Sequence, residues 1–158
     1  MKATAQTVHV PAVGEGKRGE QGHIGYLLRQ AQVAHRQRME HALADLGLTL
    51  PQFSVLTMLV AYPGASGADL ARLSLLTPQT VSVIVANLER GGAIERHPHA
   101  VHGRIRQIEV TAAGKHLLVR CRSKVKAVED ALLSGLATAD EQAIRRWLVR
   151  VAGAHRPA

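Results

Sequence analysis

Residues 77–92 read TPQTVSVIVANLERGG, and both ends of this segment carry helix-boundary signals. Thr77 can cap the first helical turn through its hydroxyl, and Pro78 suits the first helical position, where a missing N–H costs nothing. Gly91 and Gly92 stop the helix, because glycine readily takes the left-handed conformation that closes helix ends. Apolar residues at helical spacing would face a core, and these are Val81, Ile84, Val85 and Leu88.

The opposite face of this predicted helix has no side chain too bulky for a DNA major groove. At about 100° per residue, it carries Gln79, Ser82, Val83, Ala86, Asn87 and Arg90. Glutamine and asparagine can form two hydrogen bonds with adenine edges, serine can bond several base edges, and valine or alanine can contact a thymine methyl group. The face is therefore suited to reading bases.

The preceding segment predicts a partner helix. In residues 66–73, SGADLARL, Ser66 and Asp69 have the spacing of a capping box, and Leu70 and Leu73 form a core pair. A helix, a turn and a second helix with an outward polar face make a helix-turn-helix. An ordinary helical hairpin with a solvated polar face is the alternative on these residues alone.

A β-hairpin is predicted directly after the helix-turn-helix. Residues 93–96 and 104–111 read as short strands, and residues 97–103 form a loop without acidic residues. A hairpin that follows a recognition helix makes a winged helix. The loop contains His97, His99 and His102. Their spacing could surround a metal ion, yet the loop holds no cysteine or carboxylate to complete such a site, and histidine also suits a phosphate-lined groove.

Three motifs together resemble those of the MarR family of bacterial transcriptional regulators. They are LERGGAIER at residues 88–96, a wing ending in Gly103-Arg104, and EVTAAG at residues 109–114. The likeness extends over about Gly22–Ala152. It implies a mainly α fold with a small β-hairpin wing, that is, a winged helix-turn-helix with an N- and C-terminal helical dimerisation platform. His102 departs from the family pattern, which usually has an aspartate there to orient the wing-tip arginine.

The polar helix face and the resemblance together define the expected DNA-binding residues. These are Thr77, Gln79, Thr80, Ser82, Val83, Asn87, Arg90, His102, Arg104 and Arg106. Arg104 is the candidate for insertion into a narrow minor groove, where negative potential is concentrated. We expect double-stranded DNA as the partner, bound at a pseudo-palindromic operator by a homodimer that acts as a repressor rather than an activator.

Composition agrees with a nucleic-acid partner. A chain of 158 residues suits one domain with a sizeable core, and 20 Lys and Arg against 12 Asp and Glu leave a net charge of +8. The sequence shows no basic amphipathic anchor, long apolar run or signal peptide, so we expect a cytoplasmic protein without a membrane partner. It shows no nucleophile–base pair, phosphate loop or close carboxylate dyad either. We therefore expect no enzyme activity, no catalytic residues, no cofactor and no metal ligands.

The chain is expected to consist of an arm and one domain. Residues 1–21 lack periodicity and predict a flexible N-terminal arm. Residues 22–152 form a single domain, with the winged helix-turn-helix in 49–111 and dimerisation helices in 23–46 and 112–152. The platform depends on a heptad-like seam of Leu118, Cys121, Val125, Val128 and Leu132, and on a last helix with Ile144, Trp147, Leu148 and Val151. The alternative is that all three helices pack within one chain.

The resemblance also implies a small organic effector, an aromatic carboxylate or a phenol, bound between the dimerisation platform and each winged helix-turn-helix. An apolar pocket with a polar anchor would be lined by Leu28, His35, Arg36, Phe53, Leu56 and Met58. His35 equally suits a packed and hydrogen-bonded core position. The alternative function is a metal- or redox-responsive regulator that uses the wing histidines or Cys121, although a cysteine in an apolar seam is most simply a small buried hydrophobe.

Overall fold

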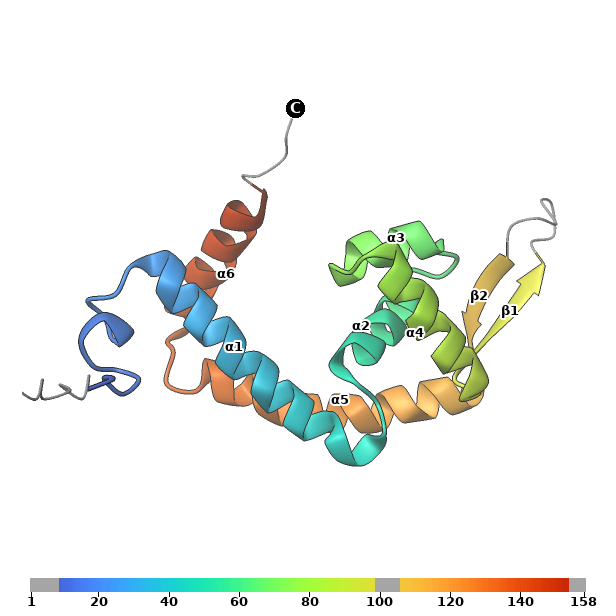
Figure 1. The fold of residues 1–158 in the computed structure, drawn as a ribbon, viewed down its shortest axis with the longest axis horizontal. Helices are drawn as coiled ribbons and strands as arrows, with labels where there is room; N and C mark the ends of the chain where they lie inside the picture. Colours follow the sequence, from blue (N-terminus) through green and yellow to red (C-terminus); the bar gives the residue numbers. More distant parts are fainter. Residues whose placement is uncertain (1–8, 99–105, 154–158) are drawn as a thin grey trace, which may run out of the picture. The chain divides into compact units, whose positions relative to one another are not determined.

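A computed structural model describes residues 9–98 and 106–153 of the chain. The elements follow in the order η1 (Gly16–Arg18), α1 (Ile24–Leu43), η2 (Ala44–Leu46), α2 (Leu50–Ala61), α3 (Gly67–Ser74), α4 (Pro78–Arg90), β1 (Ile94–Pro98), β2 (Arg106–Val110), α5 (Ala112–Leu133) and α6 (Thr138–Gly153), where η marks a 3-10 helix (Figure 1). The chain divides after Arg38 into two compact units. The predicted fold class, mainly α with a small β-hairpin, is confirmed.

The first unit holds the η1 turn against the beginning of α1. Arg18 donates from Nε to Oε1 of Gln30 over 3.2 Å and from Nη1 to the carbonyl oxygen of Pro11 over 2.9 Å. Gln30 donates in return from Nε2 to the carbonyl oxygen of Arg18 over 3.1 Å. Residues 9–21, expected to belong to an irregular arm, thus contain a hydrogen-bonded turn, while the mobility of the arm stays a prediction.

The core of the second unit forms around α2, which contacts α3, α4, α5 and β2. Side chains with no more than 2% exposure include Leu43, Val55, Leu56, Leu70, Val81, Ile94, Leu118 and Cys121. Burying one such aliphatic side chain contributes about 1.5–3 kcal/mol. The helix-turn-helix, the wing and the first half of α5 therefore share a single core.

Four helices of this unit begin with side-chain caps, including the two predicted at Ser66 and Thr77. Each cap is a hydroxyl that accepts a hydrogen bond from the backbone amide three residues further on, at Thr49, Ser66, Thr77 and Thr111. The capping boxes with Gln52 and Asp69 are both complete. Pro78 occupies the first turn of α4, and Gly92 follows it with a left-handed φ of 73°. These local signals set where the four helices start and where α4 stops.

β1 and β2 pair antiparallel and form the predicted wing (Figure 1). Ile94 lies opposite Val110 and Arg96 opposite Ile108, and the two isoleucines are 2% and 9% exposed. Side chains on strands alternate between faces, so the residues between them point away from the core. β1 runs two residues past the predicted end at Arg96, because pairing with β2 and not local pattern sets its length.

α5 packs against the core of its own chain along its first half. Leu118 and Cys121 are buried, Val125 and Val128 pack partly against the core, and Leu132 is 41% exposed. The predicted seam is therefore not open to a partner at its first two positions, because α2 and β2 lie against this part of α5. The interpretation of Cys121 as a small buried hydrophobe is confirmed.

α6 buries none of its residues. Ile144 and Leu148 are each 42% exposed, and Val151 is 43% exposed. Among the described helices, none alone has the length and apolar character needed to cross a membrane; the segments Ile24–Leu46 and Leu50–Ala61 meet that requirement only as a bent pair.

Candidate nucleic-acid interface

α4 presents two faces of opposite character. Val81, Ile84, Val85 and Leu88 are between 1% and 6% exposed and form the inner face. Gln79, Ser82, Val83, Asn87 and Arg90 are exposed on the outer face, with Ala86 half-buried between them. Val83 is 61% exposed, so its methyl groups are free to contact a thymine methyl group. The predicted orientation of α4 is confirmed, while its contacts with DNA stay predictions.

The first turn of α4 is held by two threonines from the expected DNA-binding set. The hydroxyl of Thr77 accepts from the Thr80 amide over 3.2 Å, and the two hydroxyl oxygens lie 2.8 Å apart. Both side chains are exposed. The turn therefore offers hydroxyl groups next to the positive end of the helix dipole, an arrangement that favours a phosphate group.

Asn87 and Arg90 contact each other at the other end of the outer face. Arg90 donates from Nη1 to Oδ1 of Asn87 over 3.2 Å. An amide oxygen has two lone pairs, so Asn87 can accept from Arg90 and still accept from an adenine amino group. The hydrogen bond restricts the rotation of the Asn87 side chain and so favours one orientation for base contact.

An ion pair joins the recognition helix to the wing. Nε of Arg96 on β1 lies 3.0 Å from Oε2 of Glu89 on α4, with both side chains partly exposed. Arg96 also lines a cavity of about 220 Å³ together with Ser82 of α4 and Ile108 of β2. The base of the wing thus has a polar as well as an apolar contact with the helix that precedes it. Arg96 is not among the contacts predicted from the sequence, since only the fold brings it near Ser82.

The predicted contacts at the tip of the wing are not placed by the structure. His102 and Arg104 lie outside the described residues, and Arg106 is the first residue of β2. Their roles in DNA binding stay predictions.

The predicted effector residues divide between the two units. Leu28, His35 and Arg36 lie on α1 in the first, and Phe53, Leu56 and Met58 lie on α2 in the second. Leu56 has no exposed surface, Phe53 is 9% exposed, and Met58 packs partly against the same core. The three α2 residues therefore belong to or pack against the core of the second unit, because α2 is apolar on most of its surface and is enclosed by its neighbours. The effector pocket stays a prediction.

An open pocket that the sequence did not indicate lies in the second unit. It has a volume of about 360 Å³ and is lined by residues of α2, β2 and the start of α5, among them Leu59, Ile108 and Lys115. Its residues come from three separate segments, so no local motif could have revealed it.

Among the described residues, one group of side chains has the spacing that could hold a metal ion, and it lies on the wing. Glu95, His97 and Glu109 place their ligand atoms within 4.8 Å of one another. The sequence indicates His97 as a possible metal ligand together with the loop histidines, but it gives no signal for the two glutamates.

A helix-turn-helix with an exposed polar second helix, followed by a hairpin on the same core, defines a winged-helix DNA-binding protein. Comparison with known proteins gives the family. The MarR family model matches residues 46–105. The HTH-type transcriptional repressor Rv2887 of Mycobacterium tuberculosis is 35% identical over 128 residues, which cover 81% of this chain and 92% of that protein. This chain belongs to the MarR family of transcriptional regulators, which are DNA-binding proteins and not enzymes.

Solved structures agree with this assignment. The crystal structure of the M. tuberculosis MarR family protein Rv2887 in complex with DNA matches with a TM-score of 0.67 at 33% identity and covers 82% of this chain and 97% of that one. The complex of the same protein with salicylic acid matches with a TM-score of 0.67 at 35% identity and covers 82% and 96% of the two chains.

Proposed function

We propose that two copies of this chain bind a pseudo-palindromic operator and repress transcription, and that a small aromatic acid or phenolic compound releases them. The observation that carries the proposal is the exposed polar face of α4 above its buried apolar stripe. A net charge of +8 favours binding to the phosphate backbone. The Rv2887 complexes with DNA and with salicylic acid support both halves of the proposal.

Base discrimination is expected to depend on Gln79, Ser82 and Asn87, since a good bidentate base contact is worth about 1–3 kcal/mol. DNA selected from a random pool should contain two half-sites whose centres lie about 10 base pairs apart, one helical turn. In the same selection, Asn87→Ala should relax the preference at one symmetric pair of positions.

Gln21→Ala is the control for this selection, because Gln21 is an exposed glutamine outside the helix-turn-helix. It should leave the selected sequence unchanged. An equal loss of affinity for all sequences would assign Asn87 to a phosphate contact instead. A parent protein without sequence preference over competitor DNA would refute the operator proposal.

Effector release is expected to depend on His35 or Arg36, which would bind the carboxylate of the ligand through charge-assisted hydrogen bonds. For release, the ligand must bind the state with low DNA affinity more tightly, and a 100-fold preference corresponds to about 2.7 kcal/mol per site. With salicylate as the probe, His35→Ala and Arg36→Ala should retain operator binding and lose release.

Arg29→Ala, an exposed arginine on the same helix, should respond to salicylate as the parent does. If the His35 and Arg36 variants also respond like the parent, the effector binds elsewhere. The pocket beside Lys115 is then the next site to test.

The structure does not favour a redox-responsive regulator. Cys121 is fully buried, and this burial raises the pKa of its thiol. The thiolate is the reactive form of cysteine, so a buried thiol with a raised pKa is a poor sensor.

A further inference from the structure

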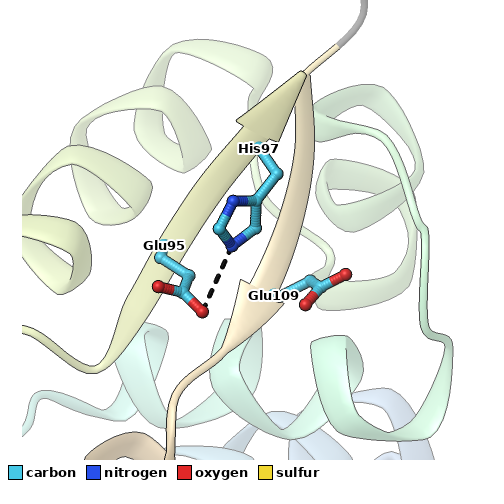
Figure 2. A group of neighbouring side chains, drawn as sticks. All are labelled: Glu95, His97 and Glu109. Atoms are coloured by element: carbon cyan, nitrogen blue, oxygen red, sulfur yellow. Dashed lines mark ion pairs between the residues drawn. The ribbon is translucent and has the colours of Figure 1, made fainter. Parts of the chain in front are cut away.

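Three potential metal ligands lie together on the outward face of the wing. Glu95 and His97 are two residues apart on β1, and the strand register places Glu109 of β2 directly opposite Glu95. Figure 2 shows these side chains on the two neighbouring strands, with the ion pair between Glu95 and His97 dashed. Nε2 of His97 lies 3.2 Å from Oε1 of Glu95, and the ligand atoms of all three residues lie within 4.8 Å of one another.

Among the described residues, the one ion pair to either carboxylate is that between His97 and Glu95. Like charges directly opposite each other on paired strands destabilise a hairpin. His97 offsets the charge of Glu95 only when the imidazole is protonated. Glu109 forms no ion pair with any residue in the described ranges 9–98 and 106–153. A cation between the strands would therefore remove a repulsion that the hairpin otherwise retains.

We propose that Glu95, His97 and Glu109 bind a divalent transition-metal ion, with Zn²⁺ as the best match. Zinc accepts imidazole nitrogen and carboxylate oxygen at about 2.0–2.2 Å, so two of its ligands lie roughly 3–3.5 Å apart. The Nε2–Oε1 separation of 3.2 Å already meets this requirement. Glu109 is exposed and can approach by rotation about its side-chain bonds.

The type of site follows from the number and exposure of its ligands. Three protein ligands leave at least one position to water, and all three side chains are exposed. The site therefore exchanges its ion with solvent and does not resemble an enclosed structural zinc site. Because its ligands come from both strands, the ion links β1 to β2 at the outward face and stabilises the wing.

Zinc binding is tested on the full chain after removal of metal with a chelator. Isothermal titration with Zn²⁺, and the absorption of bound Co²⁺ as a second probe, should show one ion bound to the wing of each chain. The double variant Glu95→Gln, Glu109→Gln should lower the affinity for Zn²⁺ at least about tenfold. Loss of a hydrogen-bond partner of a metal ligand already costs about this much, and loss of the ligand itself should cost no less. His97→Gln should do the same.

Two control variants separate this site from other histidines and carboxylates. Glu20→Gln with His116→Gln removes an exposed carboxylate and an exposed imidazole that do not belong to the wing strands, and it should leave affinity unchanged. His99→Gln with His102→Gln should also retain zinc binding, because both carboxylates and His97 remain. Unchanged affinity in the Glu95 and Glu109 double variant, or loss of binding only in the loop-histidine variant, would overturn the proposal.

Hydrogen exchange provides a readout of the link between the strands. Zinc should slow exchange of the β1 and β2 amides in the parent and leave it unchanged in the double glutamine variant. Equal slowing in both would overturn the assignment. The double variant should fold at least as well as the metal-free parent, because it lacks the opposed charges. Neither measurement uses DNA, so failure here leaves the operator proposal intact.

Discussion

Thr111 joins three elements through one side chain and its own amide. Its hydroxyl donates to the carbonyl oxygen of Gly92 over 2.6 Å and accepts from the amide of Gly114 over 3.0 Å. Its amide donates to the carbonyl oxygen of Ala93 over 3.1 Å. The end of α4, the wing and the start of α5 thus meet at close distance, which leaves no space for a side chain at residue 114.

Gly114→Ala should destabilise the protein by about 1–3 kcal/mol, the usual cost of overpacking a core. A β-carbon there would overlap the carbonyl oxygen of Ala93 and lie 2.9 Å from Cγ1 of Val110. The thermal midpoint should fall by roughly 2–4 °C for each kcal/mol. Gly25→Ala is the control, because a β-carbon at Gly25 meets no atom within 4 Å. Equal thermal midpoints for parent and Gly114→Ala would show that α5 can move away from Ala93 without loss of stability.

At the scale of the element, α3 depends on its first turn. It has only 8 residues, and short helices are marginal without tertiary support or caps. Ser66 donates to Oδ2 of Asp69 from its hydroxyl over 2.6 Å and from its amide over 3.1 Å, and Arg72 donates to Oδ1 of Asp69 over 2.5 Å. These hydrogen bonds lower the pKa of the Asp69 carboxyl from 3.8 to about 2, and the bond from the Ser66 hydroxyl contributes most.

Asp69→Asn should lower the stability near neutral pH, where the native carboxylate is charged. Because the folded-state pKa is depressed, the contribution of the carboxylate is fully present above its ordinary pKa of 3.8 and is lost as the pH falls through about 2. Urea denaturation across this pH range should therefore show that the difference in the free energy of unfolding between parent and variant decreases as the pH falls. Asp140→Asn, in the first turn of α6, should show a smaller difference. A difference that persists below pH 2 would exclude the carboxylate as its cause.

For the whole molecule, the unburied stripe of α6 is the surface that we expect the proposed homodimer to cover. Ile144, Leu148 and Val151 fall on one side of the helix and remain more than 40% exposed. Apolar surface of this kind is often covered by another subunit. The second half of α5 adds to it, since Leu132 is also exposed.

If α6 forms the interface of the proposed homodimer, Leu148→Glu should convert it into a monomer with weakened operator binding, because the charged side chain would be buried there without a partner. Light scattering after size-exclusion chromatography measures the mass, and circular dichroism checks that the helices remain. Val149→Glu is the matched control, since Val149 is 73% exposed and lies on the opposite side of α6 from the stripe. If Leu148→Glu stays dimeric, α6 is not at the interface.

The helix starts and the two faces of α4 could be predicted because they depend on residues close together in the chain. The hydroxyls of Thr49, Ser66, Thr77 and Thr111 each reach an amide three residues further on. The inner face of α4 repeats at helical spacing, so burial of Val81 and Leu88 and exposure of Gln79 and Asn87 follow together. The motifs around the wing likewise predicted the family.

Long-range packing could not be predicted in this way. Cys121 faces the core of its own chain, and Leu56 has no surface left to line a pocket, although their spacing alone permitted other roles. Glu109 lies opposite Glu95 because β1 and β2 pair in one register, and a shift of one residue would turn the side chains to the other face. The alternation of apolar residues indicates which face of each strand is buried, but it does not specify which residue of β1 lies opposite which residue of β2. Strand pairing therefore brings Glu95, His97 and Glu109 together, on the face opposite the buried Ile94 and Ile108.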